Sequence, residues 1–397
     1  MFASLPLLPA DPILGLSVAY QQDTNPAKVD LGVGIYKNDA GQTPVMAAVA
    51  AAEALRLRQE NSKAYTHPAG YPGANTAVTR LAWGADHPAV AANRVRTLQT
   101  PGGCGALRVA AELIQRAKPG ASVWVSTPTW ANHIPLLGNA GLQLREYPYY
   151  DYASHSIDFT AMTAALRQVP AGDLVLLHAA CHNPSGADLS PQQWQEIAEL
   201  AAERGFIPFI DMAYQGFGEG LEADSYGPRL LASRLPEVVL AISFSKNFGL
   251  YRERAGALSV CFASPAEADA GLSQLLSVTR ALYSMPPAHG SAIIDIILHS
   301  DELSRQWQEE LDSMRNRISG LREDLVSALH QVQQHTDFSF IARERGMFSF
   351  LGLSKEQVLR LRSDYSIYMT DNSRINVAGL SAASIDYVAG AIKAVLV

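Results

Sequence analysis

The chain has 397 residues, which is long for one hydrophobic core, so two lobes or domains are expected. Hydrophobic residues make up 48% and charged residues 17%, which is the composition of an ordinary globular protein and not of a disordered one. A net charge of -7, with no run of like charges, excludes a surface built to follow a phosphate backbone. We therefore expect no nucleic-acid partner.

The amino-terminal stretch MFASLPLLPADPILGL carries no Lys or Arg, and the first basic residue is Lys28, so the positive flank of a signal peptide is missing. No apolar stretch reaches the length of a membrane span. Three scattered cysteines, Cys104, Cys181 and Cys261, suit a reducing compartment and lack metal-ligand spacing. These features predict a cytoplasmic protein with no membrane contact and no metal site.

Short apolar runs alternate with amphipathic segments through the middle of the chain, a pattern typical of βα units around a mostly parallel sheet. One helix has a clear start, with Ser190 as N-cap and Pro191 in the first turn. The expected strands are Ser122–Ser126, Asp173–His178, Ile207–Asp211, Val238–Ser243 and Ala257–Phe262.

A long amphipathic helix is predicted over residues 301–331, interrupted only by Gly320. Short mixed elements follow it, such as FSFIARERGMFSFLGL and SRINVAGL. They predict a smaller α+β lobe, which the segment DLGVGIYKNDAG, residues 30–41, joins from the amino-terminal side.

Polar residues follow the predicted strands at their carboxyl ends, the edge where open α/β sheets bind ligands. Lys246 follows one strand, Asp211 ends another, and Asn183 follows a third. Trp130 follows a fourth strand, and a glycine-rich turn, Gly102–Gly105, directly precedes a helix. Each feature alone is ordinary, since such residues also serve as helix caps, turn residues or core.

Together these residues fit pyridoxal phosphate, which needs a lysine for a Schiff base, a carboxylate against its pyridinium nitrogen and a phosphate cradle. Lys246 is the candidate amine and Asp211 the candidate carboxylate. The Gly102–Cys104 turn can offer backbone N–H groups and a helix amino terminus to the phosphate. Hydroxyl donors and a fixed positive charge near the lysine come from Ser243, Ser245 and Arg254.

The chain resembles the aspartate and aromatic amino acid aminotransferases, which belong to subgroup Iα of the class I aminotransferases and to fold type I of the pyridoxal-phosphate enzymes. The motifs that carry the resemblance run from end to end: ADPILGL, DLGVGIYK, TPGGCGALR, HNPSGADL, DMAYQGF, SFSKNFGLYRERAG, YSMPPAHG, GMFSF and SRINVAG. The resemblance implies an α/β fold with a large domain, built on a mostly parallel seven-stranded sheet flanked by helices, and a smaller α+β domain. Its implied boundaries are an arm over 1–11 that contacts the partner of a dimer, part of the small domain over 12–43, the large domain over 44–305 and the small carboxyl-terminal domain over 306–397.

The resemblance also implies roles for single residues. Lys246 would hold the Schiff base and then shuttle the substrate proton, while Asp211 would pair with the ring nitrogen. Tyr214 and Asn183 would hydrogen-bond the ring's phenolic oxygen, and Trp130 would stack on the ring. His133 and His178 would support these residues, and the phosphate would be held by Gly103, Cys104, Ser243, Ser245, Arg254 and, from the neighbouring subunit, Tyr65.

Substrate recognition is implied by two arginines. Arg374 would form a bidentate pair with the α-carboxylate, and Arg280 would reach across a homodimer to a distal carboxylate. Gly34 lies in a segment that resembles the one closing over substrate. The implied partners are therefore amino acids, 2-oxo acids and a second copy of the chain that shares its active sites.

Two positions depart from the family pattern: Cys104 replaces a hydroxyl residue, and Met285 replaces a polar residue in YSMPP. We favour transfer between aromatic amino acids (Tyr, Phe or Trp) or aspartate and 2-oxoglutarate by a ping-pong mechanism, with a dedicated aspartate aminotransferase as the alternative. More distant alternatives are a pyridoxal-phosphate lyase or a non-catalytic binding module. A nicotinamide dehydrogenase is disfavoured because no G-x-G-x-x-G motif follows a first strand.

Overall fold

The computed structural model describes residues 2–7 and 12–396, which divide into two compact units. The large unit comprises Pro44–Arg317, and the small unit combines the described residues of 1–43 with those of 318–397. Part of the predicted arm, residues 1 and 8–11, lies outside the described residues, as do the first two residues of the ADPILGL motif.

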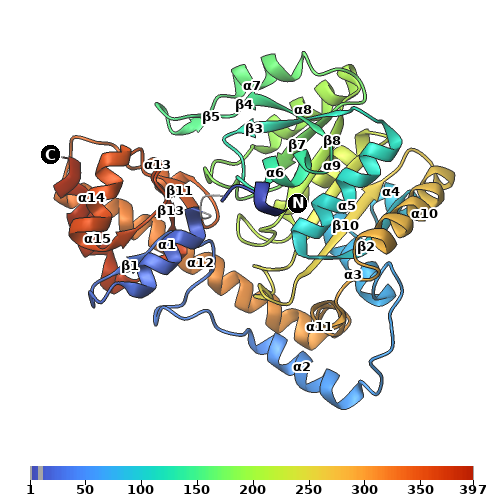
Figure 1. Cartoon of the computed structure of the whole chain (residues 1–397), viewed down its shortest axis with the longest axis horizontal. Helices are drawn as coiled ribbons and strands as arrows, with labels where there is room; N and C mark the ends of the chain where they lie inside the picture. The colour runs from blue at the N-terminus through green and yellow to red at the C-terminus, as the bar shows by residue number, and fades with distance from the viewer. Residues whose placement is uncertain (1, 8–11, 397) are drawn as a thin grey trace. The chain divides into compact units, whose positions relative to one another are not determined.

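The core of the large unit is a seven-stranded sheet, with β10 antiparallel to both of its neighbours and the other strands parallel to one another (Figure 1). This architecture confirms the predicted fold class. The central strands are apolar runs buried on both faces, as expected of a parallel sheet covered on both sides. In spatial order the strands are β2 (Val95–Pro101), β10 (Ala255–Cys261), β9 (Val238–Ser243), β8 (Ile207–Met212), β7 (Leu174–His178), β3 (Ser122–Thr127) and β4 (Gln143–Pro148).

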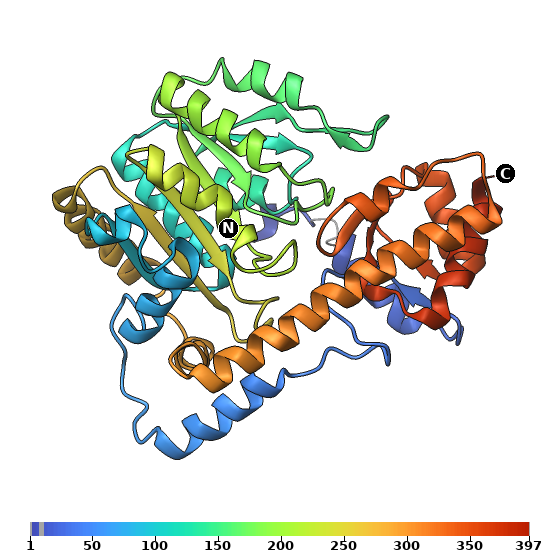
Figure 2. The ribbon, with the colours of Figure 1, turned by 180° about the vertical axis from the view of Figure 1, so that it is seen from behind.

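Helices cover both faces of this sheet, with α5 and α10 on one face and α8 and α9 on the other (Figures 1 and 2). A small hairpin pairs β5 (Tyr150–Asp151) with β6 (Ser156–Ile157). The helices are α2 (Ala47–Gln59), α3 (Pro72–Trp83), α4 (Pro88–Ala91), α5 (Gly102–Ala117), α6 (His133–Gly138), α7 (Phe159–Leu166), α8 (Pro191–Arg204), α9 (Tyr226–Arg234), α10 (Pro265–Leu282) and α11 (Ala288–Leu298).

Two helices test the sequence patterns directly. Helix α8 begins with a capping box in which Ser190 and Gln193 satisfy each other's backbone N–H, and it ends at Gly205 in the left-handed conformation. Helix α12 spans Asp301–Val332 without a break, so the predicted interruption at Gly320 is absent. The added Cβ of an alanine at position 320 would meet no atom within 4 Å, and an open glycine costs a long helix only about 1 kcal/mol.

The small unit is an α+β assembly built from both ends of the chain. Strand β1 (Val29–Asp30) pairs in parallel with β12 (Ile367–Tyr368), and β11 (Phe348–Phe350) pairs antiparallel with β13 (Arg374–Asn376). Its helices are α1 (Pro12–Gln22), α13 (Phe340–Arg343), α14 (Lys355–Tyr365), α15 (Ala382–Leu396) and the end of α12. Across the described part of the chain, no helix is both long and apolar enough to cross a bilayer.

Candidate active site

The carboxyl ends of neighbouring strands bring the predicted residues of the large unit together. Strands β7 and β8 are parallel and in register, with His178 opposite Asp211 at their ends. Strand β9 is the next parallel neighbour and ends at Ser243, three residues before Lys246. These side chains therefore leave the sheet at one edge, as the strand predictions required.

Lys246 is half-buried beside Tyr214, with its ammonium nitrogen 4.8 Å from the centre of the tyrosine ring. Burial lowers the pKa of Lys246, and the charge of Arg254 acts in the same direction. The carboxylate of Asp211 and the thiol of Cys104 oppose this lowering without cancelling it. A lowered pKa increases the fraction of neutral, nucleophilic amine near neutral pH.

Asp211 is a buried carboxylate that stays ionised. Burial alone would raise the pKa of Asp211, but the hydrogen bond from His133 opposes it most strongly, the positive charges around the carboxylate add to this effect, and the pKa is lowered. The Nε2 of His133 lies 2.9 Å from the Asp211 carboxylate. Burial lowers the pKa of His178 to about 3, the neighbouring His133 acts in the same direction, and the His178 ring is therefore neutral at neutral pH.

A chain of hydrogen bonds fixes which ring nitrogens carry protons. The backbone N–H of Asn183 donates to His178 Nδ1 at 3.1 Å, so the neutral His178 ring carries its proton on Nε2. That nitrogen lies 3.4 Å from Thr129 Oγ1, and the Thr129 hydroxyl lies 2.8 Å from His133 Nδ1. The ionised Asp211 carboxylate can only accept a hydrogen bond, so His133 carries a proton on Nε2 and donates to it.

Another buried histidine, His182, packs against the ring of His178. Its ring stacks between Tyr149 and His178, with centroid distances of 4.1 Å and 4.2 Å. Its Nε2 lies 3.1 Å from Ser126 Oγ, and its backbone N–H donates to Asp188 at 2.8 Å. Burial lowers the pKa of His182 well below its usual value, so this ring is also neutral.

The neutral state of His178 makes stability depend on pH. The unfolded chain binds a proton at pKa ~6.5, whereas folded His178 binds one only at about 3. The stability contribution is therefore fully present above pH ~6.5 and is lost as the pH falls towards 3. Between pH ~7 and ~5 we expect His178 alone to lower the free energy of unfolding by about 2 kcal/mol.

Urea unfolding of wild type and His178→Gln at these two pH values measures the effect. The variant should lose less stability on acidification, while His330→Gln, which alters an exposed histidine, should behave as wild type. Equal losses in wild type and His178→Gln would contradict the assignment.

The predicted phosphate turn begins helix α5 and lies against the loop of Lys246. Pro101 caps α5 without a side-chain hydrogen bond, which leaves the first backbone N–H groups available. A Cβ at Gly102 would collide with the guanidinium of Arg254, and one at Gly103 would lie 3.0 Å from the Cβ of Ser243. Arg254 Nη1 lies 3.4 Å from Ser245 Oγ, and the two serine hydroxyls are 3.2 Å apart. A helix amino terminus, two hydroxyls and a guanidinium thus converge as an anion site.

Gly256 allows this turn to approach strand β10. An added Cβ at Gly256 would overlap the backbone of Gly102, which cannot move without displacing the start of α5. We expect Gly256→Ala to lower the free energy of unfolding by about 1–3 kcal/mol. Gly390→Ala is the control, because its Cβ meets no atom within 4 Å and alanine favours the α15 helix by about 1 kcal/mol. Thermal unfolding of both variants measures these effects. A Gly256→Ala variant as stable as wild type would contradict the packing argument.

Three more of the predicted residues lie in the large unit, and each has different contacts. Trp130 packs edge-on against His133 at 5.2 Å between ring centroids. The side-chain amide oxygen of Asn183 is buried and has no hydrogen-bond partner among the described residues. Cys104 lies in the first turn of α5, with its sulfur 3.9 Å from the Asn132 amide nitrogen. Of these three side chains, Cys104 lies close enough to Lys246 to influence its pKa, and Asn183 keeps an unused polar atom.

Two predicted residues of the large unit do not join this group within one chain. Tyr65 is 92% exposed, and Arg280 lies exposed in the last turn of α10, where it contacts Ser284. Among the described residues, no hydrogen bond or ion pair connects either one to Lys246 or Asp211. Met285, which departs from the family pattern, lies 3.6 Å from the hydroxyl of Thr66.

The two predicted residues of the small unit lie together. Arg374 is buried in β13, donates to the carbonyl of Gly32 at 2.7 Å and stacks over the ring of Phe348 at 4.5 Å. A Cβ at Gly34 would lie 2.7 Å from the same Phe348 ring. Phe348 thus fixes the guanidinium of Arg374 and also limits position 34 to glycine.

Sequence reasoning missed Thr129 and His182, which complete the hydrogen-bond layer beneath Asp211. Both follow predicted strands, and that position is the only signal the sequence offers for them. Their partners come from separate loops, so local patterns do not predict the contacts. Among the described residues, no three His, Cys, Asp or Glu side chains come together as a metal site.

Comparisons with known proteins agree with this geometry. Residues 26–392 match the family model for aminotransferase class I and II. The chain is 45% identical to an aspartate aminotransferase of Salmonella typhi over 396 residues, covering 100% of both chains. It is also 45% identical to an aromatic-amino-acid aminotransferase of Pseudomonas aeruginosa over 394 residues, covering 99% of this chain and 98% of the relative.

A solved structure shares the whole fold. It is an aromatic-amino-acid aminotransferase from Burkholderia pseudomallei covalently bound to pyridoxal phosphate, with a TM-score of 0.98, 45% identity and 100% of both chains covered. Together with the site geometry, these matches establish that the chain belongs to the class I and II aminotransferase family.

Proposed function

We propose that the protein is a pyridoxal-phosphate-dependent aminotransferase that transfers amino groups between aromatic amino acids or aspartate and 2-oxoglutarate. The observation that carries this proposal is the placement of Lys246, whose pKa is lowered, and of the ionised Asp211 at the ends of neighbouring parallel strands, at one edge of the sheet. Relatives named for aspartate and for aromatic amino acids match the chain equally well, at 45% identity each. That balance supports a site that accepts both substrate classes.

The residues of the large unit fit pyridoxal phosphate. The anion site at Gly102–Gly103, Ser243 and Arg254 suits a phosphate, and a Cβ on either glycine would fill it. Asp211 offers an ionised carboxylate to a protonated ring nitrogen, and the buried amide of Asn183 has an unused polar atom. When bound, the cofactor supplies an aldehyde for the amino group and an electron-withdrawing ring that stabilises a carbanion.

The chain's own residues would then divide the work. Lys246 Nζ would take the proton from the α-carbon of the substrate and return it, since its lowered pKa favours the neutral amine. Asp211 would stay charged because His133 donates to it, and the Thr129 hydroxyl would hold His133 in the tautomer that does so. Tyr214, beside Lys246, and the amide of Asn183 would orient the ring, with Trp130 against its face, and the thiol of Cys104 would take the place of a hydroxyl at the phosphate.

Substrate carboxylates would bind to arginines. We propose that Arg374, held by Gly32 and Phe348, binds the α-carboxylate, and that Gly34 belongs to a segment closing over substrate. Exclusion of water by such closure protects a carbanion from side reactions. The boundaries proposed for the domains are 12–43 with 306–397 for the small domain and 44–305 for the large one.

A homodimer with shared sites accounts for Tyr65 and Arg280. Both side chains are exposed in a single chain, so we propose that each completes the site of a partner subunit. Tyr65 would reach the phosphate and Arg280 the distal carboxylate. We propose a cytoplasmic location, in keeping with three cysteines that are all free thiols.

A paired assay tests the substrate range. We expect kcat/KM for tyrosine or phenylalanine, with 2-oxoglutarate as acceptor, to lie within about tenfold of the value for aspartate. Arg280→Ala should lower kcat/KM for aspartate by about 100-fold and leave the value for phenylalanine nearly unchanged, because only the dicarboxylate needs a second cation. A large preference for aspartate in wild type would favour a dedicated aspartate aminotransferase.

A further inference from the structure

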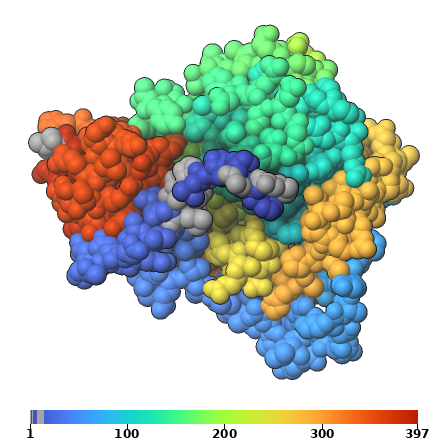
Figure 3. Space-filling view, in the orientation of Figure 1, coloured from blue at the N-terminus to red at the C-terminus, as the bar shows by residue number. Residues whose placement is uncertain are grey.

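A cavity of about 530 Å³ opens between helices α5 and α10, at the end of the sheet opposite Lys246. It is lined by the starts of strands β7, β8 and β9, whereas Lys246 follows a strand's carboxyl end. The two helices lie side by side at the surface of the large unit (Figure 3). A volume of this size is in the range of small-molecule sites, and no residue assigned above to the candidate active site lines it.

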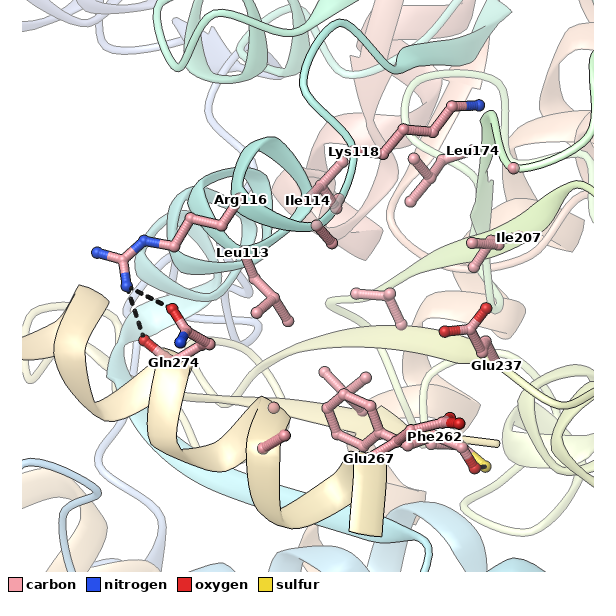
Figure 4. Close-up of a pocket in the computed structure, with 17 residues that line it drawn as sticks. Leu113, Ile114, Arg116, Lys118, Leu174, Ile207, Glu237, Phe262, Glu267 and Gln274 are labelled. Carbon is pink, nitrogen blue, oxygen red and sulfur yellow. Dashed lines mark hydrogen bonds between the residues drawn. The ribbon is translucent and has the colours of Figure 1, made fainter. Parts of the chain in front are cut away.

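The floor of the cavity is apolar and largely buried. Leu174, Val239 and Val260 rise from the sheet with 2%, 6% and 4% exposure, so the floor offers water no polar partner. Leu113 of α5 and the ring of Phe262 face each other across it (Figure 4). A flat apolar or aromatic body would therefore gain hydrophobic contact on several sides.

The available charge at the rim is negative. Glu237 and Glu267 lie at the same end of the cavity, and neither carboxylate makes a hydrogen bond or ion pair with another described residue (Figure 4). Partial burial raises the pKa of Glu237, and the charge of Glu267 raises it further. A cation placed beside Glu237 would therefore stabilise its ionised carboxylate. Glu237 and Glu267 are thus the charged groups left to a ligand.

The basic residues of the rim are already engaged. Arg116 turns away from the cavity to the side-chain oxygen of Gln274 at 3.0 Å (Figure 4). Lys118 donates to the carbonyl of Ala171 at 3.1 Å and pairs with Asp173 at 3.3 Å. An anionic ligand would have to compete with these contacts, whereas a cationic one would not.

We propose that the cavity between α5 and α10 binds a small organic ammonium ion with an apolar or aromatic body, its charge beside Glu237 and Glu267 and its body against Val239 and Phe262. This inference does not depend on the proposed function, because it uses none of the residues around Lys246. Its closest match in chemistry is an arylalkylamine, which combines one ammonium group with a flat ring.

Isothermal titration of the holoenzyme with phenethylammonium chloride tests the proposal. We expect one site per chain with Kd on the order of 0.1–1 mM, as suits a ligand of this size. Glu237→Gln should weaken binding about 3- to 5-fold, and Glu237→Gln with Glu267→Gln about tenfold or more. Ala270→Phe, which places a ring in the cavity from α10, should abolish binding.

Matched controls separate this site from others. Ala266→Phe adds the same ring to an exposed position of α10 outside the cavity, and Glu309→Gln removes a charge elsewhere; both should bind as wild type. The neutral analogue 2-phenylethanol should bind at least about threefold more weakly. No heat at ~10 mM ligand, or binding that survives Ala270→Phe, overturns the proposal. Equal binding of 2-phenylethanol and phenethylammonium would also overturn the proposal. A self-association seen by sedimentation and removed by Ala270→Phe would overturn it as well.

Discussion

Replacing Lys246 by alanine is expected to lower kcat by about 10⁴-fold or more with either aspartate or tyrosine as donor. The variant loses both the nucleophilic amine and the base that moves the α-proton, and each contributes several orders of magnitude. The surroundings favour this chemistry, because burial lowers the pKa of Lys246, whose amine lies 4.8 Å from the centre of the Tyr214 ring. Steady-state rates with 2-oxoglutarate measure the loss.

Two further variants sharpen that result. Lys246→Arg keeps a positive charge near Asp211 but not a usable amine, so it should be nearly as inactive as the alanine variant. Lys393→Ala changes an exposed lysine of α15 and should be as active as wild type. Borohydride reduction should attach pyridoxal phosphate covalently to wild type and not to Lys246→Ala. A Lys246→Ala variant with near wild-type kcat would refute the assignment.

Asp211→Asn is expected to lower kcat/KM by about 10³-fold for every amino donor. The amide of asparagine cannot hold a proton on the ring nitrogen, and a 10³-fold fall corresponds to a loss of about 4 kcal/mol of transition-state stabilisation. The fold should survive, because the amide oxygen still accepts the hydrogen bond that His133 donates to Asp211 at 2.9 Å. Activity with aspartate and with tyrosine should fall by the same factor, since Asp211 contacts neither substrate side chain.

Asp211→Glu provides the control for this prediction, because it keeps the negative charge and changes only its position. It should retain more activity than Asp211→Asn. The lowered pKa of Asp211 keeps the carboxylate charged at neutral pH, so protonation of Asp211 itself should limit activity only on strong acidification. Unchanged kcat/KM in Asp211→Asn would show that this carboxylate has no role in the reaction.

The central strands were predictable because burial on both faces produces apolar runs. Val238–Ser243 has the predicted bounds, and the structure ends β8 within one residue of the predicted Asp211. Strand β4 was not predicted, because QLREYP is largely exposed and its charged residues interrupt the apolar pattern of a buried strand. Strand β2 was likewise not predicted, because its first three residues are only half-buried and give no apolar run.

The site was predictable where one residue follows one strand and was missed where contacts join separate loops. Lys246 and Asp211 are fixed by the ends of β9 and β8, so their convergence follows from parallel pairing. Thr129 and His182 act through hydrogen bonds and stacking across loops, which no local pattern encodes. The cavity beside Glu237 is likewise assembled from segments far apart in the chain.

The most direct test of amino transfer follows the nitrogen atom. Purified protein with pyridoxal phosphate is incubated with ¹⁵N-labelled aspartate or tyrosine and unlabelled 2-oxoglutarate, and the products are analysed by mass spectrometry. We predict ¹⁵N-glutamate in an amount equal to the 2-oxo acid formed from the donor, and none with Lys246→Ala. Release of ¹⁵N-ammonia or of a decarboxylated amine in place of ¹⁵N-glutamate would contradict the assignment and indicate lyase chemistry.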